Sequence, residues 1–176
     1  MHSKYSTHSL VVMALFASLL CVFAYITIPI PTGQHITLQN FILLLTAFLF
    51  PLSQSLLIVM VWLLLGIVGI PVFVGGNAGL SYLLSPVGGY TFAFLLIAVF
   101  LPLVRPKNYN RITYTILAVL AVLLIDMTGA AWVILSNNIS IKNAILLWIL
   151  PYLPLDLVKA VIVAWIVPKF RQIIAS

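Results

Sequence analysis

Acidic residues are nearly absent from this sequence. Among its 176 residues there are two aspartates, Asp126 and Asp156, and no glutamate. Charged residues of both signs make up 6% of the chain, whereas a soluble domain carries about 25% because it needs a wettable surface. Ten charges cannot cover a soluble protein of 19.4 kDa, and the mean hydropathy of +1.28 agrees. The composition therefore excludes a cytosolic enzyme, a nucleic-acid-binding protein and a disordered linker.

Cysteine occurs once, at Cys21, so the chain can form neither an internal disulfide nor a thiolate metal site. Because Cys21 lies inside an apolar run, we expect a buried and inert thiol. The three histidines make no credible metal site, and we expect no cofactor. The sequence contains no Gly-Lys-Ser or Gly-Lys-Thr, which excludes a Walker A nucleotide site, so any energy for transport must come from a partner.

The apolar residues, 64% of the chain, come in long unbroken runs. A membrane-spanning helix needs about 20 apolar residues, with a range of roughly 17–25. The runs predict an all-α membrane protein, a six-transmembrane-helix bundle that forms a single integral membrane domain over residues 1–176. The predicted spans are residues 10–28, 37–50, 55–70, 86–104, 112–135 and 151–170. The first run is longer than the apolar region of a signal peptide, so we interpret it as a retained helix.

Prolines mark several of the predicted ends. Pro29 and Pro31 stop the first span, and residues 51–54 are expected to form a turn between the second and third. Proline is favoured in the first turn of a helix and poor in its interior, so the last span is predicted to start near Pro151. Residues 144–150 would then be a separate apolar turn against the outer surface.

Basic residues set the predicted orientation, because positively charged loops stay in the cytoplasm. With six spans and both termini cytoplasmic, six of the eight basic residues fall inside. These six are Lys4, Arg105, Lys107, Arg111, Lys169 and Arg171. Lys142 falls outside and Lys159 lies within a span, whereas the opposite orientation would place the six outside. The formal charge of +6 then reflects basic loops that face anionic lipid of the bilayer.

Asp156 and Lys159 lie three residues apart in an otherwise apolar segment. A charge at the centre of a bilayer costs about 2.5–3.5 kcal/mol on the insertion scale, so it needs a reason. Positions i and i+3 share a helix face, so the two side chains can neutralise each other and present polar atoms to one cavity. We predict that the pair binds substrate. The alternatives are a purely structural ion pair and a lysine that extends to the interface.

A glycine-rich loop, residues 69–79, follows the third predicted span. Glycine lets backbone amides approach a ligand closely, so Gly75 and Gly76 are candidate contacts, with an ordinary turn as the alternative. Asn77 brings a carbonyl and an NH₂ group, enough for a bidentate contact with a neutral polar ligand. Gln39, near the outer end of the second span, either faces the cavity or bonds to a neighbouring helix.

Two further features have no single interpretation. Asp126 lies in the fifth span with no partner nearby in sequence, so it is part of the cavity, tied to another helix, or protonated and neutral. Ala14, Ala17 and Ser18 put small residues on the first span, which permits close approach of another helix. That helix belongs either to a docking partner or to this bundle.

With these segments identified, the chain resembles the biotin-specific S component, the BioY family, of energy-coupling-factor transporters. Three segments carry the resemblance: GIPVFVGGNAG at residues 69–79, SPVGGY at 85–90 and PLDLVKA at 154–160; TLQ at 37–39 also matches. The family usually has glycine where this chain has Ser85, threonine where it has Val87, and glycine where it has Leu155. These differences fall at structural positions and bear on backbone geometry more than on the ligand.

The resemblance implies a high-affinity biotin-binding subunit in the bacterial plasma membrane, which captures biotin from outside and delivers it inward. It also implies three protein partners, a shared transmembrane coupling protein and a pair of ATPases, and a loop over the outer mouth of the site. The predicted substrate-binding residues are Asp156, Lys159, Asn77, Gln39, Gly75, Gly76 and Tyr90, the last from the second matching segment. The predicted docking residues are Ala14, Ala17 and Ser18.

The residues themselves suggest how biotin would sit. Asp156 can accept from a ureido N–H, while Lys159 and Asn77 can donate to the ureido carbonyl, with the ligand carboxylate at the wetter outer mouth. A competing pose puts Lys159 on that carboxylate.

Two other function classes stay open, a stand-alone carrier or channel and a small membrane-bound transferase. The transferase is disfavoured, and no enzymatic activity is expected, because the chain has few catalytic groups.

Overall fold

The computed structural model describes residues 6–29 and 35–175, so Lys4 and Pro31 of the preceding predictions lie outside the described residues. In chain order the helices are α1 (Thr7–Phe23), α2 (Gln39–Leu49), α3 (Leu52–Ile67), α4 (Leu80–Leu84), α5 (Gly88–Val104), α6 (Arg111–Asn137), α7 (Ile141–Ala144) and α8 (Leu153–Ala175). Single helical turns are η1 (Val74–Gly76) and the π-helical η2 (Ile145–Ile149). The strands β1 (Thr27–Pro29) and β2 (His35–Thr37) pair antiparallel.

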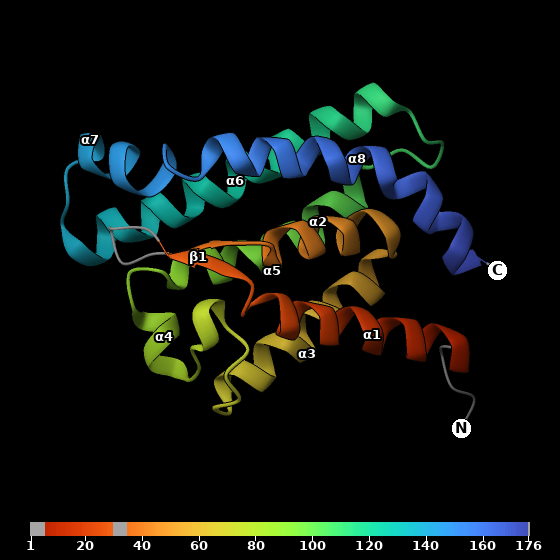
Figure 1. Ribbon diagram of the computed structural model, residues 1–176, viewed down its shortest axis with the longest axis horizontal. Helices are drawn as coiled ribbons and strands as arrows, with labels where there is room; N and C mark the ends of the chain where they lie inside the picture. The colour runs from red at the N-terminus through yellow and green to blue at the C-terminus, as the bar shows by residue number, and fades with distance from the viewer. Residues whose placement is uncertain (1–5, 30–34, 176) are drawn as a thin grey trace.

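The long helices run back and forth between two ends of the molecule (Figure 1). The start of α1, the end of α8 and the connection between α5 and α6 lie at one end. The β-hairpin, α4 and α7 lie at the opposite end. The connections therefore alternate between the ends, as expected for a bundle of antiparallel neighbours.

Helix α2 is the centre of the core. It packs against α1, α3, α5 and α8, and nearly all of its side chains are buried. A helix that is apolar all round is a buried helix, which fits the residues from Phe41 to Phe48. The buried aromatic rings of Phe48 and Tyr114 stack with centroids 5.0 Å apart, which joins α2 to α6.

Two arginines close the carboxyl-terminal end of α2. Arg105 Nη2 donates to the Phe50 carbonyl at 2.9 Å, and Arg171 Nη2 donates to the Phe48 carbonyl at 3.2 Å. The last carbonyls of a helix have no partner within the helix and carry partial negative charge, so cations there are stabilising. These contacts tie both the α5–α6 loop and the end of α8 to the core at the end that holds the termini.

Each of the six predicted ranges contains a helix, and the chain is mostly helical, as predicted. The first predicted range runs too far, because α1 ends at Phe23 and residues 27–29 form β1. The second predicted range begins at the last residue of β2 rather than in a helix. Ile26, Thr27 and Ile28 are β-branched and precede a proline, and both properties favour extended backbone. The pairing register sets Thr27 opposite Thr37.

The turn expected at residues 51–54 is also shorter than predicted. Pro51 is the N-cap of α3, and its carbonyl accepts from the amides of Gln54 and Ser55 at 3.0 and 2.9 Å. Proline has no amide hydrogen to leave unpaired at a helix start, so α3 begins directly after it. The expected apolar turn at 144–150 is instead helical, since Ile141–Ile149 forms a segment bent by 54° from the long helix that follows.

The helices differ in how far they can reach across a bilayer. Among the described residues, α6 alone is long and apolar enough to cross a membrane by itself, and the bent pair Ile141–Ile149 and Leu153–Ile174 passes when taken together. The other four apolar helices, α1, α2, α3 and α5, have 17, 11, 16 and 17 residues. At 1.5 Å per residue, α2 is only about 16 Å long.

Candidate ligand-binding site

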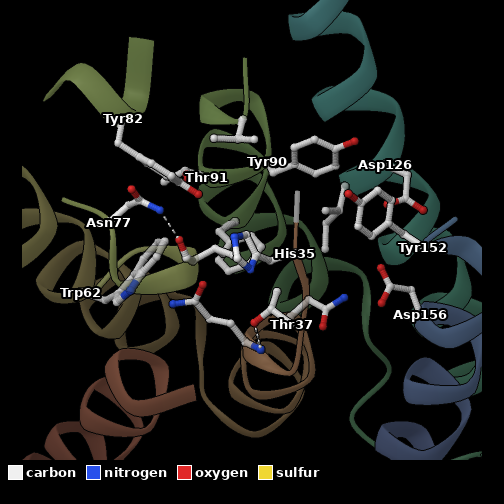
Figure 2. Close-up of a pocket in the computed structure, with 16 residues that line it drawn as sticks. His35, Thr37, Trp62, Asn77, Tyr82, Tyr90, Thr91, Asp126, Tyr152 and Asp156 are labelled. Carbon is white, nitrogen blue, oxygen red and sulfur yellow. Dashed lines mark hydrogen bonds between the residues drawn. The ribbon is translucent and has the colours of Figure 1, made fainter. Parts of the chain in front are cut away.

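A cavity of about 140 Å³ lies at the end of the molecule that carries the hairpin. Apolar surface predominates in its wall, although apolar or aromatic side chains and polar or charged side chains contribute in equal number (Figure 2). Its lining comprises His35, Thr37, Gln39, Asn40, Trp62, Val74, Asn77, Tyr82, Val87, Tyr90, Thr91, Phe94, Ile125, Asp126, Tyr152 and Asp156. A concave, mostly apolar site with a few convergent polar groups is the usual form of a small-molecule pocket.

The Asp156–Lys159 pair forms as predicted, and it is buried. Lys159 Nζ lies 2.6 Å from Asp156 Oδ1, and the two residues are 8% and 6% exposed. The same ammonium donates to the Thr37 carbonyl at 2.6 Å and to Asn40 Oδ1 at 3.3 Å. An ammonium has three hydrogens to donate, and these three acceptors match that number. Asp156 lines the pocket, whereas Lys159 is not among the lining residues.

Gln39 shows both behaviours that the sequence left open. Its side chain is fully buried and lines the pocket. Its Nε2 donates to the Leu20 carbonyl of α1 at 2.7 Å and to the Val72 carbonyl at 3.2 Å. The Val72 carbonyl also accepts from Trp62 Nε1 at 2.8 Å. Gln39 therefore bonds to a neighbouring helix and holds the glycine-rich loop against the pocket.

The two glycines of that loop make a turn and do not line the pocket. Gly75 and Gly76 have φ values of 73° and 75°, which side chains rarely tolerate. The Gly75 amide donates to the Ala24 carbonyl at 2.9 Å, so it is engaged with the chain itself. A Cβ at Gly75 would lie 3.2 Å from His35 Nε2, and one at Gly76 would lie 3.1 Å from the Tyr25 ring. The alternative interpretation, an ordinary turn, fits these contacts.

The exposed end of the pocket carries Asn77 and His35. Asn77 Nδ2 donates to the Val74 carbonyl at 2.7 Å, and its side chain is exposed (Figure 2). His35, half-buried on β2, has Nδ1 3.2 Å from Thr27 Oγ1 of the paired strand. The hairpin and the glycine-rich loop thus contact each other beside the cavity.

Two tyrosines from neighbouring segments complete the wall. The Tyr90 hydroxyl donates to the Trp148 carbonyl of η2 at 2.5 Å, and its ring packs directly on Gly129 of α6. Burial raises the pKa of Tyr82 to about 12, with a hydrogen bond to Thr91 acting in the opposite direction. The Tyr82 hydroxyl therefore keeps its proton at neutral pH and stays a hydrogen-bond donor.

Asp126 faces the pocket from α6. Its side chain is 2% exposed, and its Oδ2 has no hydrogen-bond partner among the described residues. Of the three interpretations that the sequence allowed, membership of the cavity fits this position. Trp62, Phe94 and Tyr152 also line the pocket. They could not be identified from sequence, because aromatic side chains within apolar runs carry no local signal of the face they occupy.

The three small residues of α1 do not share one environment. Ala14 and Ser18 are exposed and lie four residues apart, and Ser18 Oγ donates to the Ala14 carbonyl at 2.8 Å. Ala17 is 7% exposed and belongs to the hydrophobic core. An exposed small-residue face therefore contains Ala14 and Ser18, and Ala17 instead permits close packing within this chain.

Comparisons with known proteins agree with this arrangement. The family model of the BioY family matches residues 1–176. The chain is 29% identical over 157 residues to a Lactococcus lactis subsp. cremoris protein named biotin transporter BioY2, with 89% of this chain and 86% of that protein covered. It is 30% identical over 164 residues to a Thermotoga maritima protein named biotin transporter BioY, with 93% and 96% covered.

A solved structure has the same fold. It is described as the S-component for biotin from an ECF-type ABC transporter, and it superimposes on this chain with a TM-score of 0.88 at 26% sequence identity. The match covers 98% of this chain and 95% of that one. The overall arrangement of helices is therefore one that occurs in a solved S component.

Proposed function

The chain belongs to the BioY family, and we propose that it is the membrane subunit that captures biotin from outside and delivers it inward within an ATP-driven energy-coupling-factor transporter. The observation that carries the proposal is the Asp156 carboxylate, which lines a pocket and is held by an ion pair with Lys159. Relatives named biotin transporters and the S-component fold support it.

The proposed topology has six membrane spans and cytoplasmic termini. The alternation of the connections between two ends in Figure 1 supports six passes. Arg105, Lys107 and Arg171 gather at the end that holds the termini, as the positive-inside rule requires of a cytoplasmic face. The pocket then opens on the opposite, outer side, where Asn77 is exposed.

The short helices are compatible with this topology. Helix α2 is enclosed by other helices of the bundle, so its ends need not reach the lipid headgroups on both sides. Polar backbone away from regular helices is tolerated at membrane depth where it is buried in protein or lines a cavity. Parts of the hairpin and of the glycine-rich loop meet that condition, because His35, Thr37 and Val74 line the pocket and are at least partly buried.

The pocket offers the ureido ring of biotin a hydrogen-bond acceptor. Asp156 Oδ1 is engaged by Lys159, and the carboxylate lines the cavity, so it can accept from a ureido N–H. A hydrogen bond to a charged group is worth roughly 1.5–3 kcal/mol. The apolar wall around Trp62 and Phe94 suits the thioether ring and the hydrocarbon chain.

Lys159 is assigned a positioning role. Its three acceptors, on β2, α2 and α8, account for the hydrogens of its ammonium. The pose that needs Lys159 on the ligand carboxylate would require one of these bonds to break. We therefore place the carboxylate of biotin at the outer mouth, near His35 and Asn77.

The energy for transport must come from partners, since the chain has no Walker A sequence. A transmembrane coupling protein and two ATPases are the proposed partners. The exposed small-residue face of α1, formed by Ala14 and Ser18, permits a partner helix to approach closely. Ala17 is not part of that proposal, because its side chain is buried within this chain.

The test is a binding experiment on the purified chain. Mass spectrometry of small molecules that co-purify should detect biotin, and calorimetry should measure saturable binding of added biotin. Recovery together with an ATPase pair supports the transporter subunit over a stand-alone carrier. Turnover of the ligand by the pure chain, or a folded chain that binds no biotin, would contradict the proposal.

Two biotin derivatives test the pose. Biotin methyl ester should compete nearly as well as biotin, because the ester removes only the charge at the outer mouth. A derivative methylated at a ureido nitrogen should compete poorly, because it loses an N–H donor next to Asp156. The reverse order of the two competitors would place the carboxylate at Asp156 and Lys159.

A further inference from the structure

Asp126 is the second carboxyl group of the binding pocket, and the proposed function does not use it. The chain has two acidic residues in all, and both line the same cavity, one from α6 and one from α8. Figure 2 shows Asp126, Tyr152 and Asp156 along one wall. The two carboxyl groups therefore face a ligand from adjacent helices.

The two carboxyl groups of this wall differ in their partners. Among the described residues, Asp156 forms an ion pair with Lys159. Asp126 Oδ2 has no hydrogen-bond partner in the described part of the chain, although the side chain is 2% exposed. Burying a polar group without a partner is costly, more so in a membrane. The lack of a partner for this Asp126 oxygen is explained if a bound ligand donates a hydrogen bond to it.

We propose that Asp126 contacts the ligand and makes this pocket selective for a ring edge with N–H donors on both sides. This inference rests on the proposed function. A ureido group has such an edge, with an N–H on each side of its carbonyl. One N–H would donate to Asp156 and the other to Asp126.

The charge on this wall widens the range of ligands that the pocket can bind. Two carboxyl groups and one ammonium leave an excess of negative charge when both acids are ionised. A cationic ligand beside Asp126 favours that ionised form, so the wall can accept a cation as well as a neutral donor. A cyclic guanidinium has the same shape and the same two donors as a cyclic urea, and it is cationic at neutral pH. The ligand carboxylate is negatively charged, as this wall is, so the wall repels it.

The experiment compares biotin with 2-iminobiotin, in which a guanidinium replaces the ureido group. The intact chain is purified in detergent, and both affinities are measured by calorimetry at neutral pH. The wild-type chain should bind 2-iminobiotin within about tenfold of biotin. In Asp126→Asn, which keeps the shape but removes the charge, 2-iminobiotin should lose at least about tenfold more affinity than biotin.

A matched control comes from the same cavity. Thr91 lines the pocket and is 5% exposed, so Thr91→Val alters the polarity of the wall without altering its charge. It should change both affinities by the same factor. Asp126→Glu retains the carboxyl group and should retain the relative affinity for 2-iminobiotin.

Several results would overturn this inference. Equal losses for the two ligands in Asp126→Asn, or no loss for either, would mean that Asp126 does not recognise ligand charge. If Asp126→Asn does not fold, the comparison of the two ligands on the wild-type chain still tests the inference. A wild-type chain that binds biotin but not 2-iminobiotin would contradict the proposal that this wall accepts a cation. If the folded wild-type chain binds neither ligand, the proposed function itself fails, and that outcome is separate from the others.

Discussion

The Lys159 ammonium donates a hydrogen bond of 2.6 Å to the carbonyl oxygen of Thr37, 122 residues earlier in the chain. Thr37 ends β2, and its Oγ1 accepts from the Gln39 amide at the start of α2 at 3.0 Å. Lys159 therefore joins α8 to the point where the hairpin enters the core. A lysine that only balanced Asp156 would not need this contact.

The first prediction concerns this lysine. Lys159→Met should destabilise the chain by about 3–5 kcal/mol, because it leaves Asp156 as an uncompensated buried charge. It should also weaken biotin binding, since the Asp156 carboxylate and the end of the hairpin lose their common partner. Thermal unfolding in detergent and calorimetric titration with biotin measure the two effects.

The double variant Asp156→Asn with Lys159→Met is the control for charge. It removes both members of the pair, so much of the lost stability should return while biotin binding stays weak. If Lys159→Met and Asp156→Asn each leave biotin affinity unchanged, the pair has a structural role alone, and the assignment of the site to Asp156 is wrong.

The second prediction concerns the packing of α6 against the pocket. A Cβ at Gly129 would overlap the Tyr90 ring, whose hydroxyl is bonded to the Trp148 carbonyl. Gly129→Ala should push this ring toward the cavity, cost about 1–3 kcal/mol of stability through overpacking, and reduce biotin affinity. Unfolding and calorimetric titration measure both changes.

Gly69→Ala is a matched control for that substitution. Gly69 has φ of 102°, and a Cβ there would meet no atom within 4 Å, so the substitution strains the backbone away from the cavity. We expect a loss of stability of about 1–3 kcal/mol with unchanged biotin affinity. Equal loss of affinity in the two variants would show that general destabilisation, rather than Tyr90, accounts for the effect of Gly129→Ala.

The third prediction tests partner docking on α1. Ala14→Trp or Ser18→Trp should separate the partner helix and reduce biotin uptake by roughly tenfold, as expected for overpacking of about 1–3 kcal/mol. Biotin binding by the isolated chain should not change, because neither residue lines the pocket. Ile116→Trp, at an exposed position of α6, should leave uptake intact. Normal uptake with tryptophan at Ala14 would remove the docking face from the proposal.

The fourth prediction concerns topology. Cysteines placed singly at Asn108 and Ser136, in a Cys21→Ser background, report on the two ends of α6, and both positions are exposed. In intact cells an impermeant maleimide should label position 136 and not position 108, because the basic loop is cytoplasmic. Labelling at position 108 would reverse the proposed orientation.

Much of the site could be found from local sequence, because charge in an apolar segment is conspicuous. Asp156 and Lys159 stand three residues apart on what had to be a helix, and their pairing followed from that spacing. The six helical ranges followed from runs of apolar residues between prolines and charged loops. These features depend on neighbours along the chain, so composition and spacing were sufficient to predict them.

The hairpin and the roles of the loop residues depended on contacts between distant segments. The strand at Thr27 exists because Thr37 pairs with it. The Gly75 amide is taken by Ala24 rather than offered to a ligand. The sequence could not distinguish Ala17, which packs in the core, from Ala14, which is exposed, because α1 is apolar on all faces.

The sequence by itself determined that this protein is a bundle of apolar helices with a buried ion pair, since hydropathy and charge act locally. Only the tertiary structure decided which polar groups share the pocket. Asp126 and Asp156 are 30 residues apart in sequence and meet at one wall because α6 and α8 pack together. A helix without a polar face can turn any side toward its neighbours, so the packing of the whole bundle fixes which side chains meet the ligand.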